Sequence, residues 1–253
     1  WQEAQAHPAL GGGAGSYEAY WLQHRTSELH VVDAHNLYLE TLAELGPVGL
    51  ALLALALGIP LAAAIRARRH PLVAAAVGVY AAFLVHAIVD WDWEVPAVTL
   101  TALFAGAAIV IAAPGEETKP APLAPRVRIG LAMAVAAVSI IAFVALVGNM
   151  ALSRSEHAAA RGNWAASAKQ AKRATHWLPW SAEPWRLLGE AQMVRHEDAR
   201  PALRTAIGKD DGNWLLWFDL AAASKGPAAQ QALARAKALN PLSPEIAGLG
   251  GAG

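Results

Sequence analysis

The side chains best suited to chemistry lie just ahead of a long apolar segment. In DAHNLYLETLAELGPVGL (33–50), His35 stands beside Asn36 and is followed by Glu40. An imidazole at this place can act as a general base or as a hydrogen-bonding clamp, although a single loop histidine is more often an ordinary surface residue. We predict a helix with Asp33 as its N-cap, which places His35 in the first turn and puts Asn36 and Glu40 on one stripe.

Arg25 is the one permanent cation among residues 1–44, which contain six carboxylates. Its guanidinium can grip a phosphate through two parallel hydrogen bonds, or it can pair with Glu28 at helical spacing; the sequence leaves both open. No His-x-x-x-His or His-Glu-x-x-His pair is present, so we predict no metal site. GGGAGSYEAYW (11–21) lacks the Gly-Lys-Ser/Thr of a nucleotide loop, which favours a flexible turn.

Four segments without Asp, Glu, Lys or Arg predict membrane-spanning helices. They are residues 45–65, 71–89, 95–115 and 129–153. Each has about the 20 residues that a helix needs to cross a bilayer, and each is apolar all round, whereas a helix of a soluble bundle needs a polar face. With 55% hydrophobic and only 16% charged residues, the chain is predicted to be an all-α, polytopic membrane protein whose four spans lie within 45–152.

The charges of the loops predict the orientation in the membrane. The turn RARRH (66–70) and the linker 114–128 carry cations, so the positive-inside rule places both in the cytoplasm. DWDWEVP (90–96) has three carboxylates, no cation and two tryptophans suited to an interface, which places it outside. The helical loop region 1–44 and everything after residue 153 then also lie outside, in a multi-pass protein of a bacterial inner membrane.

His86 falls inside the second predicted span, near its outer end. We expect its ring to bond Asp90 one helical turn further on, because ionisable groups at this depth need a partner. The two residues would then either have a structural role or hold the residues of the site in position.

Residues 153–248, rich in Ala, Trp and alternating charges, are predicted to form a soluble helical domain, followed by a Gly/Ala-rich tail at 249–253. KRATHWLPWSAEPWRLLGEA aligns with RTAIGKDDGNWLLWFDLAAA at an offset of 32 residues, which pairs Trp185 with Trp217. The pattern resembles the tetratricopeptide repeat, an α-solenoid of helical hairpins. Such hairpins form either a groove for a peptide or protein partner or a structural cap on the membrane domain. We expect both tryptophans to be interhelical core.

The segment HNLYLETLAELGPVGL resembles the His-Asn-x-Tyr-Leu … Glu-x-Gly-x-x-Gly signature of the bacterial O-antigen ligase and polymerase family. WQEAQAHPALGGGAGSYEAYW is similar to the Trp-x-x-Ala … His-Pro-x-x-Gly-x-Gly-x-Gly-x-Phe segment of that family's large extracytoplasmic loop. HAIVDWDWEVPA resembles its His-x-x-x-Asp … Pro-Ala stretch, and some members carry C-terminal tetratricopeptide repeats. The resemblance covers about residues 1–113.

This resemblance implies a metal-independent, cofactor-free and inverting glycosyltransferase. It would move a glycan from an undecaprenyl-diphosphate carrier to a lipid or saccharide acceptor on the outer face of the inner membrane. The family's loop histidine matches His35, which we expect to be catalytic, and we expect the donor to be bound by Arg25, Asn36, Tyr38 and Glu40. The family also has preceding spans and a further arginine ahead of the position of Trp1, so we expect this stretch alone to be inactive.

Two alternatives remain open from the sequence. One is a protein O-oligosaccharyltransferase, since acceptor choice depends on pocket shape. The other is a non-enzymatic membrane scaffold that recruits a protein partner through its repeats. None of these interpretations involves a nucleic acid.

Overall fold

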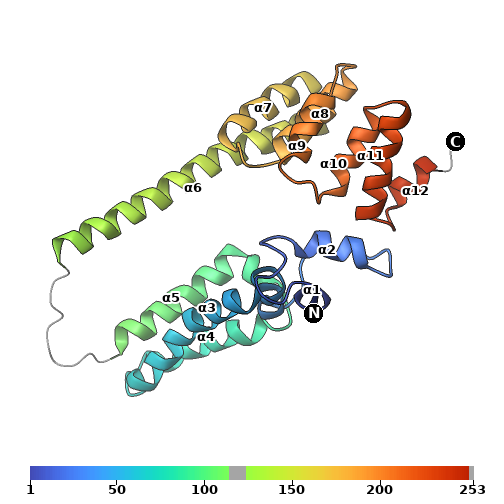
Figure 1. The fold of residues 1–253 in the computed structure, drawn as a ribbon. Coiled ribbons are helices and arrows are strands. Elements are labelled where there is room, and N and C mark those ends of the chain that lie inside the picture. Colours follow the sequence, from blue (N-terminus) through green and yellow to red (C-terminus); the bar gives the residue numbers. More distant parts are fainter. Residues whose placement is uncertain (114–123, 251–253) are drawn as a thin grey trace. The chain divides into compact units, whose positions relative to one another are not determined.

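The computed structural model of the chain describes residues 1–113 and 124–250, and every regular element in these two ranges is a helix. No β-strand occurs within them. The prediction of an all-α protein is therefore confirmed for the described part of the chain (Figure 1). Lys119 in the predicted cytoplasmic linker and most of the predicted 249–253 tail lie outside the described residues.

The chain divides into two compact units, each described here by itself. Among the described residues, the first contains 1–24 and 29–113, and the second contains 25–28 and 124–250. The last predicted span therefore groups with the C-terminal helices, so the grouping of four spans in one domain at 45–152 stays a prediction.

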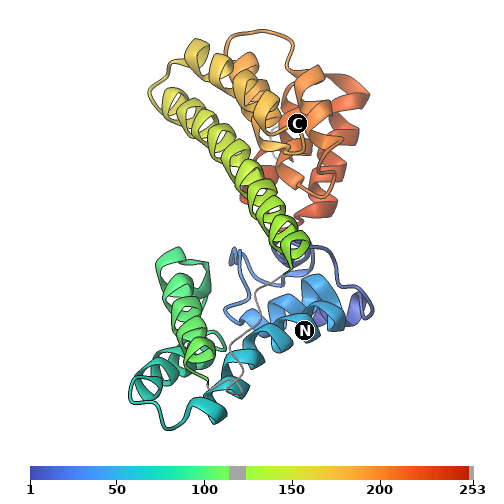
Figure 2. The ribbon, with the colours of Figure 1, turned by 90° about the vertical axis from the view of Figure 1, so that its left-hand side faces the viewer.

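The first unit is built on three apolar helices. Its elements are α1 (Gln2–Ala6), α2 (Tyr17–His24), α3 (Leu37–Ala67), α4 (Val73–His86), the short 3₁₀ helix η1 (Asp92–Glu94) and α5 (Pro96–Ala112). Helix α5 packs on both α3 and α4 around Tyr80, Ile109 and small residues such as Ala63 and Ala102 (Figures 1 and 2). Gly106 allows the close approach, because a Cβ there would lie 3.2 Å from both Pro60 and the Tyr80 ring.

Helix α3 contains a break at Gly46, whose φ of 66° lies in the left-handed region. Pro47 follows and has no N–H to donate to the carbonyl of Ala43. The glycine-rich loop supplies the missing donors: the N–H of Gly12 bonds Ala43 O at 2.9 Å, and that of Gly13 bonds Glu44 O at 2.8 Å. The predicted flexible turn is thus a close-packed loop whose N–H groups donate to the carbonyls that the break leaves without a donor.

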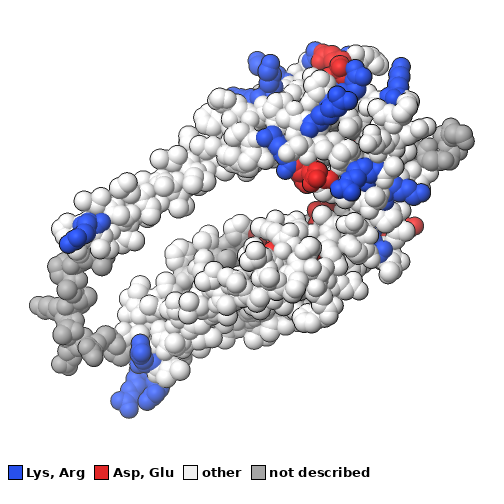
Figure 3. Space-filling view, in the orientation of Figure 1, with Lys and Arg blue, Asp and Glu red and all other residues white. Residues whose placement is uncertain are grey.

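Two helices of the described chain are long and apolar enough to cross a membrane, namely α3 and α6 (Pro125–Ala160). None of residues 47–62 and none of residues 125–147 is buried within the structure, which argues against core helices of a soluble protein. The helices α4 and α5 have 14 and 17 residues, so at 1.5 Å per residue they reach about 21 and 26 Å, short of a core about 30 Å thick. In Figure 3 most of the visible surface of α3–α5 carries no charged side chain, and a group of cations lies at the turn between α3 and α4.

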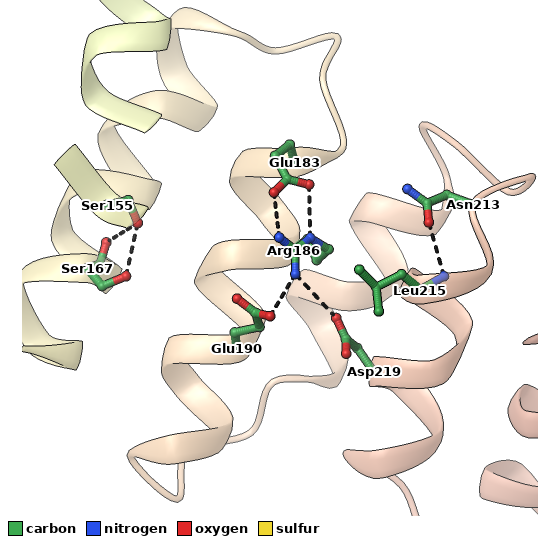
Figure 4. Close-up of polar contacts among 8 residues, drawn as sticks. All are labelled: Ser155, Ser167, Glu183, Arg186, Glu190, Asn213, Leu215 and Asp219. Atoms are coloured by element: carbon green, nitrogen blue, oxygen red, sulfur yellow. Dashed lines mark hydrogen bonds and ion pairs between the residues drawn. The ribbon is translucent and has the colours of Figure 1, made fainter. Parts of the chain in front are cut away.

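The second unit is a series of helices, each packed on the next. After α6 it contains α7 (Trp164–Trp177), α8 (Glu183–Val194), α9 (Arg200–Ile207), α10 (Trp214–Ala222), α11 (Gly226–Leu239) and α12 (Pro244–Gly250). Only the C-terminal part of α6 joins this series, where Ser155 Oγ lies 3.0 Å from Ser167 Oγ and donates to Ser167 O at 2.9 Å (Figure 4).

Small and aliphatic side chains hold these helices together. The core of α9, α10 and α11 includes Leu203 and Leu220, with the half-buried Trp217 packed against it. A Cβ on Gly189 of α8 would lie 2.7 Å from Leu203, so this glycine allows α8 and α9 to approach closely. Trp185 is half-buried as well, which leaves its role as core a prediction.

Candidate functional site

The His35–Tyr38 segment caps the C-terminal end of α4. A helix leaves its last carbonyls without an intrahelical donor, and this segment supplies one donor to the last turn of α4 and two to the residues that directly follow it. The N–H of Leu37 bonds Ala87 O at 2.9 Å, the Asn36 Nδ2 amide bonds Ile88 O at 2.8 Å, and the Tyr38 hydroxyl bonds Leu84 O at 2.9 Å. Asn36 and Tyr38, predicted to bind substrate, thus direct these polar groups at the protein backbone and fix the chain next to His35.

Asn36, and not Asp33, is the N-cap of α3, because its Oδ1 accepts from the N–H of Leu39 at 2.9 Å. The helix begins at Leu37, so the prediction that His35 lies in the first turn is wrong. Asparagine is as favourable an N-cap residue as aspartate, and Asn36 directly precedes the first residue of α3.

His35 is exposed and stands in a left-handed backbone conformation, with φ of 52°. Its Nδ1 lies 3.0 Å from the carbonyl oxygen of Asp33. A carbonyl oxygen only accepts, so Nδ1 carries the hydrogen of the neutral ring and Nε2 keeps its lone pair. This tautomer leaves Nε2 as the atom able to take a proton.

Three carboxylates gather beside this segment. Ligand atoms of Asp33, Glu40 and Glu94 all lie within 4.8 Å of one another, and Glu40 Oε2 also accepts from the N–H of Ala34 at 2.8 Å. Desolvation and the neighbouring Asp33, which is also its hydrogen-bond partner, raise the pKa of Glu94. Oxygen ligands of this kind suit a hard divalent cation, so within the described part of the first unit these three residues could hold one. Glu40 was predicted to contact the donor; Asp33 and Glu94 had not been assigned to the site.

His86 bonds a different carboxylate from the predicted one. Asp90 does lie one turn further on, since its N–H bonds His86 O at 3.1 Å, but its Oδ2 is 4.0 Å from His86 Nδ1. Asp92, carried by η1, places its Oδ2 at 2.7 Å from the same atom. The pairing of His86 with a nearby carboxylate is present, but its main partner is Asp92. Spacing alone could not reveal this, because it depends on where the helix stops.

Arg25 does not belong to this group of side chains. Its segment, 25–28, counts with the second unit, where Nη1 donates to the carbonyl of Glu28 and Nη2 to Asn240 Oδ1, both at 2.9 Å. The structure thus brings His35, Asn36 and Glu40 together in the first unit, whereas Arg25 belongs to the second unit.

The second unit contains a half-buried charge cluster that sequence reasoning missed. Arg186 of α8 donates to Glu183 at 2.5 and 2.9 Å and to Glu190 at 2.6 Å, and Asp219 of α10 lies 4.0 Å away (Figure 4). Burial lowers the pKa of Arg186, but the bonds and charges of the two glutamates outweigh this and raise it. Burial, together with the charge of Glu190, raises the pKa of Asp219 to about 7.

A signal for this cluster is present in the repeat itself. The 32-residue offset that pairs the two tryptophans aligns Asp219 with Leu187, which is 5% exposed. Because the aligned position in the preceding hairpin is core, the carboxyl of Asp219 is expected to be buried. The glutamates three residues before and four residues after Arg186 indicate that this arginine is the centre of a charge cluster.

Comparisons with protein-family models, with characterised proteins and with solved structures give no significant match for this chain.

Proposed function

We propose that the protein is a membrane glycosyltransferase of the O-antigen ligase type. It would transfer a glycan from an undecaprenyl-diphosphate carrier to an acceptor on the outer face of a bacterial inner membrane. The observation that carries the proposal is the setting of His35: an exposed imidazole with Nε2 available, fixed to the end of α4 and placed directly ahead of an apolar helix. A lipid-linked donor keeps its tail in the bilayer and its head at the surface, where such a group would meet it.

In the proposed reaction, His35 Nε2 takes the proton of an acceptor hydroxyl as that oxygen attacks the anomeric carbon. The bond between that carbon and the diphosphate oxygen breaks on the opposite face, so the configuration inverts. The leaving diphosphate needs a cation, and Arg25 is the proposed one. In the described structure Arg25 donates to Glu28 and Asn240, so the diphosphate would have to replace these acceptors.

The proposed topology has four spans. Two of them consist of α4 and α5 together with the apolar residues that flank these shorter helices. Trp91 and Trp93 would lie at the outer interface and the arginines at 66–69 in the cytoplasm. The chain has no native cysteine, so Arg68→Cys and Ser181→Cys can be compared directly with an impermeant maleimide on intact cells or spheroplasts. Only Ser181→Cys should react, and equal labelling of both would contradict the orientation.

The second unit is proposed to be a tetratricopeptide-like domain on the same outer side. The support is its succession of short packed helices and the 32-residue offset, which takes Trp185 on α8 to Trp217 on α10.

The test of His35 uses asparagine, because Asn tolerates a left-handed backbone better than most residues and lacks a titratable ring. His30→Asn is the matched control: His30 is also an exposed histidine of the outer loop, and it bonds Glu18 Oε1 at 2.7 Å. Expressed from the complete gene in a strain without its native enzyme, His35→Asn should lower glycan transfer about 100- to 10,000-fold at equal membrane levels. The control should transfer normally. Equal transfer by both variants would favour the scaffold interpretation.

A further inference from the structure

A groove of about 570 Å³ lies between α4 and α5, a volume in the range of small-molecule sites. Apolar side chains of both helices form most of its wall, among them Val79 and Phe83 of α4 and Val98 of α5. Val85 and Phe104, elsewhere on the same two helices, are 64% and 72% exposed. The surroundings of the groove are therefore as apolar as its wall, which suits an aliphatic chain in a bilayer.

One corner of the groove is polar. His86 and Asp92 line it together, and their 2.7 Å bond joins Nδ1 to Oδ2. A carboxylate only accepts, so Nδ1 carries the hydrogen and Nε2 of the neutral ring is left as an acceptor. Asp92 Oδ1 is buried and accepts no hydrogen bond from the described residues. Two hydrogen-bond acceptors at one corner favour a ligand that donates hydrogen bonds, as a hydroxyl group does.

The charges around this corner argue against a phosphate. The sequence has no Lys or Arg in residues 29–65 or 70–113, while Asp90 and Glu94 lie close along the chain to Asp92. An anionic head group would meet these carboxylates with no Lys or Arg beside them and would lose its hydration without gaining a permanent cation. An uncharged head group with hydroxyls meets acceptors alone.

We propose that the groove between α4 and α5 binds an amphipathic lipid, with its aliphatic chain along the apolar wall and an uncharged, hydroxyl-bearing head group on His86 and Asp92. Binding there does not depend on glycosyl transfer by His35, so each can fail without the other.

The test is photolabelling of the protein in nanodiscs with two probes that share one diazirine-bearing alkyl chain. One probe is an alkyl glucoside and the other is the alkyl phosphate. Labelled peptides are identified by mass spectrometry. Ala82→Trp fills the groove from an exposed position on its wall, and Ala107→Trp places the same bulk at an exposed position of α5 outside the wall. His86→Phe keeps a ring but removes the acceptor.

We expect the glucoside to label α4 and α5, Ala82→Trp to abolish this labelling and Ala107→Trp to leave it unchanged. His86→Phe should weaken glucoside labelling about fivefold, as expected for the loss of one hydrogen bond, and the phosphate should label less than the glucoside. Equal labelling by both probes would overturn the head-group assignment. Labelling that Ala82→Trp does not change would overturn the site itself. In a second experiment a photoreactive residue is placed at position 82, and its capture of a protein segment in place of the lipid would also overturn the site.

Discussion

Asp219 should make the second unit less stable as the pH rises, and Asp219→Asn should remove this dependence. The side chain is 8% exposed, and its pKa is raised from 3.8 to about 7, by burial first and then by Glu190. A raised pKa in the folded state means that folding favours the protonated form. The stabilisation is complete below about pH 4 and is lost progressively as the pH rises to about 7.

The size of the effect follows from the pKa difference. About three pKa units at 1.36 kcal/mol each give about 4 kcal/mol of stability lost by pH 8, relative to the protonated carboxyl. Asparagine resembles the protonated acid at every pH. The variant should therefore be more stable than the natural protein by about 4 kcal/mol at pH 8 and by less than half of that at pH 5.

The assay must report on the second unit alone. Because the chain has no cysteine, Ala206→Cys, at a fully buried position of α9, provides a single thiol that reacts only when this unit opens. Urea unfolding of the protein in detergent is followed by pulses of a dipyridyl disulfide, which reacts with thiols at both pH values. Asp210→Asn, an exposed carboxyl of the same unit, is the control and should be nearly neutral. Parallel stability curves for Asp219→Asn and the natural protein between pH 5 and pH 8 would refute the reasoning.

Two glycine substitutions test the packing of the two units. Gly189→Ala should destabilise the second unit by about 1–3 kcal/mol, because its Cβ would meet the buried Leu203 at 2.7 Å. Gly208→Ala is the control and should not destabilise it, since the nearest neighbour of its Cβ is 3.5 Å away. Equal shifts in the thermal unfolding of the two variants would contradict this account. Gly46→Ala should cost about 1–2 kcal/mol or more, since it forces a left-handed φ on alanine and sets its Cβ 2.8 Å from a carbonyl oxygen. Gly58→Ala, in open space on the same helix, is its control, and resistance of the first unit to proteolysis is the readout; equal resistance of the two variants would show that the break at Gly46 is not required.

The apolar segments were predictable because their signal is long and uniform. The uncharged stretches at 45–65 and 129–153 correspond to parts of α3 and α6. Their ends were not predictable in the same way, since a helix stops where capping and turn contacts compete with it. Within the stretch 71–89 the helix α4 has only 14 residues, because the residues after His86 form a turn in which their N–H groups bond carbonyls three or four residues earlier.

The candidate site was predictable in its residues but not in its pairings. His35 and the Asn36–Tyr38 segment stand out in the sequence, yet only the fold shows that Asn36–Tyr38 caps the end of α4. The glycine-rich loop is the clearest miss: Gly11 is required there by a backbone approach so close that a Cβ on it would lie 2.3 Å from Glu44 C. Contacts between residues more than thirty positions apart carry no local sequence signal.

The most direct test of the proposed function is transfer by the purified protein, expressed from its complete gene, with a synthetic undecaprenyl-diphosphate glycan and an acceptor in the presence of a metal chelator. The measurement is the rate of glycan transfer together with the anomeric configuration of the new bond. The account predicts an inverted product at a rate that the chelator does not change, and a loss of about 100- to 10,000-fold in His35→Asn but not in His30→Asn. Transfer that the chelator abolishes, a product with retained configuration, or equal rates for the two variants would contradict it.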